Sequence, residues 1–404
     1  METDINNTSN PNAALSQSKI AELETAQSFY RMVYNQFKEN KAALFGLFTI
    51  IFFVLVAVGA PVIEWALSVD ANTQNVFNRY KPPFSSVQAS QDVRDQMVQT
   101  FYLKSPNLAK DIEAQLLAKN LVQPIRPEDA MYDWVNLPSD KAIEAMKQIN
   151  TPVQSDLIKS VKNFNSYHVF GTDELGRDVL MRLVYGTQVS MGVGVLVAIV
   201  SAFIGLLVGA LAGYYGGMID TVLMRTTDAL LSLPLLPVLV VIAAIDLQKV
   251  PFLSSITQYG NESIIKLVFI LCLFSWMVVA RLVRGSILSL REREFILAAK
   301  TLGATDATII IRHMFPNVIA PLLVSVTLGV GESILFEAAL SFLGLGIQPP
   351  TPSWGNMLFN ALELIYKAPF LAIIPGVLIL LVVVSFNFLG DGLQDAIDPK
   401  SVRR

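Results

Sequence analysis

Six apolar stretches of roughly twenty residues each restrict the fold of this chain most strongly. They are Ala42–Ile63, Val189–Tyr214, Val222–Ile245, Ile264–Leu282, Val318–Leu340 and Phe370–Leu389. Crossing the hydrocarbon core of a bilayer takes about 20 apolar residues in a helix. A helix also satisfies its own backbone groups, which water cannot reach there. Because 53% of the residues are hydrophobic and only 16% are charged, we predict an all-α integral membrane protein with six transmembrane helices.

The third stretch predicts a broken helix. It contains Pro234 and Pro237, and proline removes a backbone donor and clashes with the preceding turn. We expect a break or kink there, with the freed backbone groups satisfied inside the protein.

The polar segments predict the organisation of the chain. Residues 1–41 form an N-terminal segment without an early apolar core or a small-residue cleavage site, so we expect no removable signal peptide. Residues 42–66 hold the first helix, and 186–392 form the membrane core with a loop at 285–316. Residues 393–404 are a C-terminal tail. Segment 67–185 has mixed charge and several prolines. It is too polar to span and predicts an extramembrane subdomain of helices or a partly irregular segment.

Lysine and arginine in short loops predict the orientation. On one side of the membrane lie Arg31, Lys38, Lys41, Arg281, Arg284, Arg291, Arg293, Lys300, Arg312, Lys400, Arg403 and Arg404. The opposite short loops hold only Lys249, Lys266 and Lys367. The positive-inside rule therefore places both termini and the 281–316 loop in the cytoplasm. Segment 67–185 then faces outward.

The charged stretch from Arg293 to Pro316 predicts two short helices joined by a glycine. Ala298 and Ala299 favour a first helix, and Gly303 supplies the left-handed residue that ends it. Thr305 or Asp306 can cap a second helix that runs to Pro316. Such an element is suited to dock into another protein. Apolar Phe295, Leu297, Leu302 and Ile309 are expected to enter a groove of the partner, with Arg293 and Glu294 at the rim. We interpret His313 as a cation at a helix C-terminus.

Other candidate residues lie in or near the spans. Gly205, Gly209 and Gly213 recur on one helical face and predict close packing of a neighbouring helix. At the cytoplasmic edge, Asp220, Arg225 and Asp228 form either a gate or second partner contact, or an ordinary ion pair between Arg225 and Asp228.

Two acidic residues are predicted inside the fifth span. Glu332 and Glu337 project about 140° apart on a helix, so they do not form one site. One can line a translocation path, or Glu337 can hold a structural hydrogen bond.

The stretch from Arg293 resembles the cytoplasmic coupling loop of ABC importer permeases. Ala298, Ala299, Gly303 and Pro316 fall at the family's spacing, and Leu297 stands where the family often has Glu. Six further segments occur in the same order as in this family: GTDELGRDVLMRLVYGTQVS, GYYGGMIDTVLMRTTDALLSLP, WMVVARLVRGSILSLREREF, RHMFPNVIAPLL, EAALSFLGLGIQPPTPSWGNML and FLGDGLQDAIDP. They resemble the dipeptide/oligopeptide/nickel-type permeases, in particular the second of their two paired subunits. Residues 67–165 lie outside the resemblance.

The resemblance implies the six-helix fold of type I importer permeases in a bacterial inner membrane. It implies that peptides, nickel chelates or related solutes arrive on a soluble or lipid-anchored binding protein. A second homologous permease subunit completes the pathway, and two ATP-binding subunits supply ATP and Mg. The chain contains no Gly-x-x-x-x-Gly-Lys-Ser/Thr. We therefore expect it to bind no cofactor itself, to be no enzyme, and to borrow ATP hydrolysis from these partners. Its expected contacts include the peptide substrate and membrane lipid.

Two other functions stay open at this point: an ion-gradient-driven secondary transporter, and a membrane scaffold that presents the outward segment. The absence of a detectable internal repeat disfavours the secondary transporter. The pI near 5.6 gives no indication of nucleic-acid binding. With one cysteine, Cys272, and two separated histidines, His168 and His313, we expect no metal site.

Overall fold

A computed structural model describes residues 31, 33–67, 69–74, 78–89, 91–245 and 261–397. Within these ranges the chain divides into two compact units. The first unit comprises segments from residues 1–52, 193–336 and 379–404, and the second unit comprises 53–192 and 337–378. Most of the predicted N-terminal segment, the end of the predicted tail, Lys249 and the three basic residues at the C-terminus lie outside the described residues.

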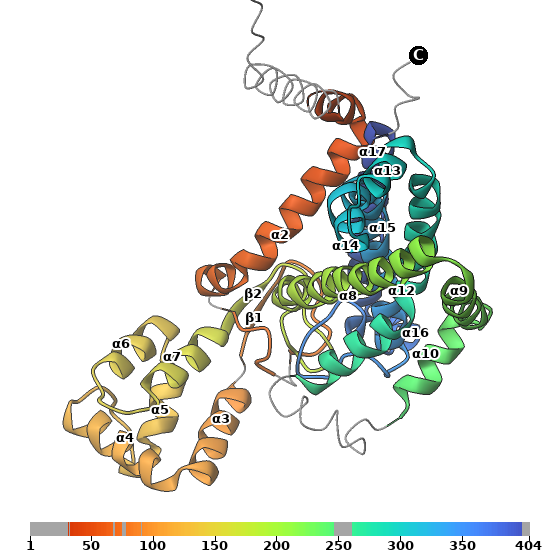
Figure 1. Ribbon diagram of the computed structural model, residues 1–404. Coiled ribbons are helices and arrows are strands. Elements are labelled where there is room, and N and C mark those ends of the chain that lie inside the picture. The colour runs from red at the N-terminus through yellow and green to blue at the C-terminus, as the bar shows by residue number, and fades with distance from the viewer. Residues whose placement is uncertain are drawn as a thin grey trace, which may run out of the picture. The chain divides into compact units, whose positions relative to one another are not determined.

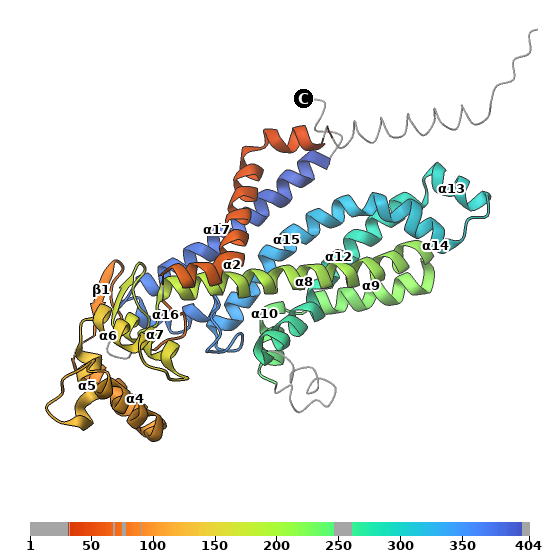
Figure 2. The same cartoon turned by 90° about the vertical axis from the view of Figure 1, so that its left-hand side faces the viewer.

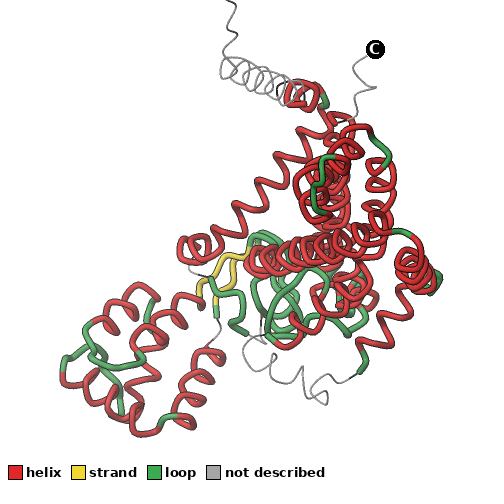
Figure 3. The backbone as a smooth tube through the Cα atoms, viewed as in Figure 1, coloured by secondary structure: helices red, strands yellow, loops and turns green. Residues whose placement is uncertain are grey.

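Five helices of the described chain are long and apolar enough to cross a bilayer. They are α2 (Lys41–Leu67), α8 (Val179–Tyr215), α12 (Glu262–Arg291), α15 (Phe315–Phe342) and α17 (Phe370–Ile397). A sixth candidate span is the pair α9 (Gly217–Leu231) and α10 (Leu235–Ala243), two helices bent by 84° at the break between them (Figure 1). The predicted all-α membrane fold is confirmed, and Figure 3 shows helix as the dominant structure.

The bend occurs where the prolines predicted a break. Pro234 immediately precedes α10 with φ −68° and ψ 106°. The residue before a proline disfavours helical backbone, so α9 ends ahead of it. Pro237 lies in the first turn of α10, where a missing N–H removes no intrahelical bond.

Several helices are longer than the apolar stretches that predicted them. Helix α8 begins at Val179, α12 continues to Arg291 and α17 continues to Ile397. Apolar composition marks only the part that matches the hydrocarbon, whereas a helix can continue into the headgroup region with polar residues. The predicted 285–316 loop therefore begins within helix, and its non-helical part starts at Glu292.

In the first unit, helices α8 and α12 pack closely through the three predicted glycines. A Cβ atom at Gly205 would lie 2.6 Å from the Val279 Cβ, and one at Gly209 would lie 2.5 Å from the Ala280 carbonyl oxygen. A Cβ atom at Gly213 would lie 3.0 Å from the Arg284 carbonyl oxygen. The missing side chains thus let the two backbones approach. Figure 2 shows the end of α8 beside α14 (Asp306–Thr308) and near α13 (Glu294–Thr301).

In the second unit, the polar insert folds into a helical subdomain with its own core. Its helices are α3 (Gln91–Lys104), α4 (Pro106–Ala118), α5 (Ala130–Asn136), α6 (Ser139–Lys147) and α7 (Gln154–Asn163) (Figure 1). Trp134 is fully buried among apolar residues from all five helices, and its indole Nε1–H donates to the Ala142 carbonyl at 2.8 Å. The insert is thus a packed structure and not an irregular loop.

Two short strands mark where the chain enters and leaves the insert. Strand β1 (Ser85–Gln88) pairs antiparallel with β2 (Asn165–His168), in the register Ser85 opposite His168. Figure 3 shows this pair as the yellow segments. The insert is also tied to α2 because the Lys159 ammonium lies 3.5 Å from Glu64 and 2.9 Å from Asp70.

Candidate functional site

The loop between α12 and α15 forms the helix–glycine–helix element that the sequence predicted. Helix α13 spans Glu294–Thr301, and Gly303 follows with a φ of +81°. The Gly303 N–H donates to the Lys300 carbonyl, and the Ala304 N–H donates to the Ala299 carbonyl at 3.1 Å. These two bonds define a Schellman helix end, which requires a left-handed residue. A Cβ at Gly303 would meet nothing within 4 Å, so backbone conformation rather than space requires glycine.

The second helix begins as predicted but does not end at Pro316. Thr305 is the N-cap, and its Oγ1 accepts a hydrogen bond from the Thr308 N–H at 3.4 Å. Residues Ile309–Met314 form a wider π-helical turn, in which the Phe315 N–H donates to the Ile310 carbonyl. Helix α15 then starts at Phe315. Pro316 lies directly after this wider turn, as the second residue of α15. The interpretation of His313 as a C-terminal cation is therefore wrong, since the helix continues beyond it.

One face of the loop is buried in the first unit. Ile296, Ile309, Met314 and the α15 residue Val318 pack with Val279, Val283 and Ile287 of α12 into one apolar cluster. Ile309 is fully buried, so the expectation that it enters a partner's groove is wrong. The wider turn changes the helical phase that the sequence pattern assumes. This cluster fixes α13 and the second helix to the membrane helices.

The opposite face of the loop presents apolar side chains to the outside. Phe295 is 47% exposed, Leu297 is 52% exposed and Leu302 is 88% exposed. Exposed large apolar side chains that gather on one short element are typical of an interaction surface. We call the exposed set the loop face; it comprises Arg293, Glu294, Phe295, Leu297, Ala298, Leu302 and Gly303. Of the other predicted loop residues, Pro316 is exposed, whereas Ala299 and His313 are half-buried.

A hydrogen bond that the sequence did not indicate holds the loop in place. The Tyr214 hydroxyl at the end of α8 donates to the Asp306 Oδ1 at 2.6 Å. The Arg291 guanidinium donates to the Tyr214 carbonyl at 3.3 Å. The sequence indicates Asp306 only as a helix cap, and no local pattern distinguishes Tyr214 from the neighbouring Tyr215.

The acidic residues of α9 pair with arginines of α12. The carboxylate of Asp220 accepts two hydrogen bonds from Arg284, at 2.5 and 2.6 Å. Asp228 accepts from Arg281 at 2.5 Å. The predicted pair between Arg225 and Asp228 is wrong, because Arg225 is exposed and Asp228 turns to the neighbouring helix. Two ion pairs therefore link α9 to α12.

The two carboxylates of α15 have different surroundings. Glu337 is fully buried, and its carboxylate accepts hydrogen bonds from the Ser190 hydroxyl at 2.9 Å and the Ser341 hydroxyl at 2.8 Å. The Ser190 oxygen in turn accepts from the Trp354 N–H at 3.1 Å. This network fits the structural interpretation of Glu337. Glu332 is exposed.

The fold and the loop define a multi-span helical membrane protein that carries a helix–glycine–helix element between two spans. Residues 205–403 match the family described as binding-protein-dependent transport system inner membrane component. Residues 28–83 match the N-terminal transmembrane domain of oligopeptide transport permease C. The chain belongs to this family of ABC importer permeases, in its dipeptide/oligopeptide branch. The fold class that the resemblance implied is therefore confirmed.

Two relatives illustrate the similarity. The dipeptide transport system permease protein DppC of Alkalihalophilus pseudofirmus is 41% identical over 233 residues, which cover 58% of this chain and 72% of that protein. The glutathione transport system permease protein GsiD of Escherichia coli is 42% identical over 234 residues, with the same two coverages. Among solved structures, one of the MetNI methionine ABC transporter is 20% identical, covers 54% of this chain and 96% of that chain, and gives a TM-score of 0.43.

Proposed function

We propose that this permease forms half of the translocation pathway of an ATP-driven importer for di- or oligopeptides or related small solutes. The names of the relatives, a dipeptide and a glutathione permease, support the substrate class. The second half of the pathway is a homologous permease subunit, and a binding protein delivers the solute. ATP hydrolysis resides in separate partner subunits that carry ATP and Mg.

The observation that carries this proposal is the loop face on its buried support. A rigid short helix can transmit motion only if it moves as one body with its partner. The cluster around Ile296, Ile309 and Met314 supplies that rigidity on the membrane side. The exposed Phe295, Leu297 and Leu302 supply an apolar surface for a groove on the ATPase, in the helix-in-groove mode. Leu297 stands at a position where the family often has Glu. The proposed contact with the ATPase is therefore apolar at this position.

The two pairs between α9 and α12 support a further role near the same loop. Asp220–Arg284 and Asp228–Arg281 join the bent span to the helix that leads into the coupling loop. We assign them as a latch that transmits loop movement to α9. The exposed carboxylate of Glu332 is the acidic side chain proposed to face the solute path.

The decisive experiment is co-purification with candidate ATPase partner subunits, together with vanadate-sensitive, binding-protein-dependent uptake. Leu302→Asp places a charge on the loop face and should abolish both. Leu103→Asp in the insert is a matched control, because Leu103 is 86% exposed and Leu302 is 88% exposed. The control should retain both activities. If Leu302→Asp retains ATPase binding and uptake, the loop face does not couple the two proteins.

The proposed topology places both termini and the loop in the cytoplasm of a bacterial inner membrane, with the insert outside. Cys272 is the only cysteine of the sequence, so single cysteines can be introduced after a Cys272→Ala change. In intact cells, a membrane-impermeant maleimide should label Glu144→Cys in the insert. It should label Thr301→Cys in the loop only after the membrane is broken. The reverse pattern would invert the topology.

A further inference from the structure

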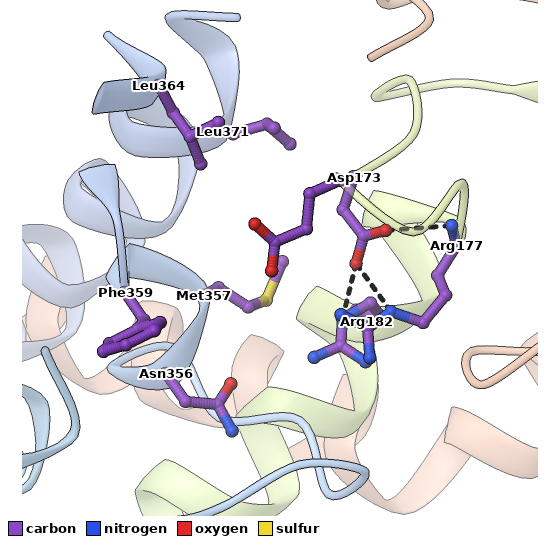
Figure 4. A pocket seen from close by; sticks show the side chains of 9 residues that line it. Asp173, Arg177, Arg182, Asn356, Met357, Phe359, Leu364 and Leu371 are labelled. Atoms are coloured by element: carbon purple, nitrogen blue, oxygen red, sulfur yellow. Dashed lines mark hydrogen bonds and ion pairs between the residues drawn. The ribbon is translucent and has the colours of Figure 1, made fainter. Parts of the chain in front are cut away.

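A small pocket in the second unit contains a buried arginine that lacks a full set of partners. Asp173 and Glu174 line it from the turn before α8, and Arg177 and Arg182 line it from that turn and the start of the helix. Asn356, Met357, Phe359, Leu364 and Leu371 form the other side (Figure 4). The cavity measures about 40 Å³, which exceeds the minimum of roughly 15 Å³ that a water molecule needs.

Arg182 is 3% exposed, and its Nη1 is buried without a hydrogen-bond partner. Its Nε lies 3.4 Å from the Asp173 Oδ2, an oxygen that already accepts a 2.7 Å hydrogen bond from the Arg177 Nε. Figure 4 shows Asp173 joined to both arginines by dashed lines, with Asn356, Met357 and Phe359 across the pocket. The Asp173 carboxylate is thus shared by two guanidinium groups, and Glu174 supplies the second carboxylate of the lining. A buried donor without an acceptor is unfavourable, so the site is incomplete as it stands.

No side chain of the wall makes a hydrogen bond to this Nη1 donor. The Asn356 side chain is engaged in the turn after Trp354: its Nδ2 donates to the Thr351 carbonyl at 2.7 Å and its Oδ1 accepts from the Ser353 N–H at 3.0 Å. Leu364 and Leu371 are buried apolar side chains. Glu174 is half-exposed at the pocket. A ligand oxygen atom can accept from the Arg182 Nη1, and an apolar part of the ligand can lie against the leucines and Phe359.

We propose that this pocket binds a single carboxylate group, which completes the hydrogen bonds of the Arg182 guanidinium. A planar guanidinium pairs with a planar carboxylate through parallel N–H···O bonds, which a spherical anion cannot form. The carboxylate comes either from a small organic acid or from the C-terminus of a peptide. The peptide source rests on the proposed function, whereas the organic acid does not.

The test measures ligand-dependent thermal stability of the purified full-length chain in lipid nanodiscs at constant ionic strength. Sodium formate should raise the midpoint of unfolding with a saturable, millimolar dependence, and sodium chloride should not. Arg182→Gln should remove the response to formate. Arg79→Gln, an exposed arginine in the same unit, should keep it. Equal stabilisation by chloride, or an unchanged formate response in Arg182→Gln, would overturn the proposal.

A second variant keeps the test decisive if Arg182→Gln does not fold. Glu174→Gln removes a negative charge at the pocket and should tighten formate binding by about two- to fivefold, the range for a partly exposed charge. Unchanged or weaker binding would contradict a carboxylate site. To separate the two sources, alanyl-alanine is compared with its C-terminal amide. Stabilisation by the free acid alone assigns the peptide source, and stabilisation by formate alone assigns the small acid. If neither ligand acts, the site is not a carboxylate site.

Discussion

The hydroxyl of Tyr214 donates to the Asp306 Oδ1 at 2.6 Å and so joins the end of α8 to the start of the helix after Gly303. Its removal tests how firmly the loop must be held. Tyr214→Phe should cost about 1 kcal/mol of local stability, the usual net value of one hydrogen bond. We expect faster hydrogen exchange in 304–308 and a lower uptake per ATP hydrolysed. Tyr215→Phe, 49% exposed in its native form, is the control and should leave both quantities unchanged.

The positive φ of Gly303 makes this position sensitive to any side chain. Gly303→Ala should cost about 1–2 kcal/mol, because a Cβ disfavours the left-handed region. Gly303→Val should cost more, because β-branched residues tolerate this region least. Gly285→Ala is the matched control, since a Cβ there also meets nothing within 4 Å but the glycine lies inside α12. Uptake by the assembled transporter should fall only for the Gly303 variants. Full uptake by a well-expressed Gly303→Val protein would show that the helix end is not needed.

The two ion pairs between α9 and α12 should differ in strength. Side chains of Asp220 and Arg284 are 18% and 34% exposed, whereas those of Asp228 and Arg281 are 58% and 52% exposed. Double-mutant cycles to alanine should give a coupling above about 1 kcal/mol for the bidentate pair. The exposed pair should give about 0.2–1 kcal/mol. Unfolding free energies in mixed detergent micelles would measure both, and Arg225→Ala should have almost no effect. Equal couplings would mean that burial and geometry do not distinguish the pairs.

The contact between the insert and the end of α2 should respond to acid. Burial alone would raise the pKa of the Asp70 carboxyl, but hydrogen bonds from the Asn72 N–H and Lys159 outweigh it and hold the pKa below its ordinary value. The hydrogen bond to Asp70 raises the pKa of Lys159 above its ordinary value, against the effect of burial. The carboxylate therefore stabilises the fold above its unfolded pKa, and this stability is lost as pH falls through the lower folded pKa. The ammonium contributes below its unfolded pKa, and its contribution is lost only as pH rises through the raised folded value.

Thermal unfolding between pH 3 and pH 8 checks this dependence. Wild type should be more stable than Asp70→Asn from pH 5 to pH 8, and the difference should shrink below about pH 4. Glu144→Gln, an exposed carboxylate without a described ion pair, is the control and should follow wild type. A difference that persists unchanged to pH 3 would show that Asp70 acts through something other than its charge.

Local patterns predicted most of the membrane fold. Apolar length located the spans, and the prolines located the bend before α10. The left-handed conformation of Gly303 followed from helix-end chemistry within five residues of chain. These features depend on neighbours in sequence, which a sequence displays directly.

Features that depend on tertiary contacts could not be predicted from local sequence patterns. The spacing of Arg225 and Asp228 predicted an ion pair between them. Because α9 packs against α12, Asp228 instead accepts a hydrogen bond from Arg281. The wider turn at Ile309–Met314 changed which face is buried, so Ile309 turned inward. The unpaired Nη1 of Arg182 becomes visible only when residues almost two hundred positions apart enclose one cavity.

The antiparallel pairing of β1 with β2 has a consequence for the history of this protein. Ser85 lies opposite His168, so the chain departs toward the helical insert and returns from it at adjacent points. A segment whose two ends lie side by side can be inserted or deleted in one genetic event without moving the transmembrane helices on either side. The insert, whose core is formed by residues 89–164 alone, is therefore organised as an exchangeable module on a transporter scaffold.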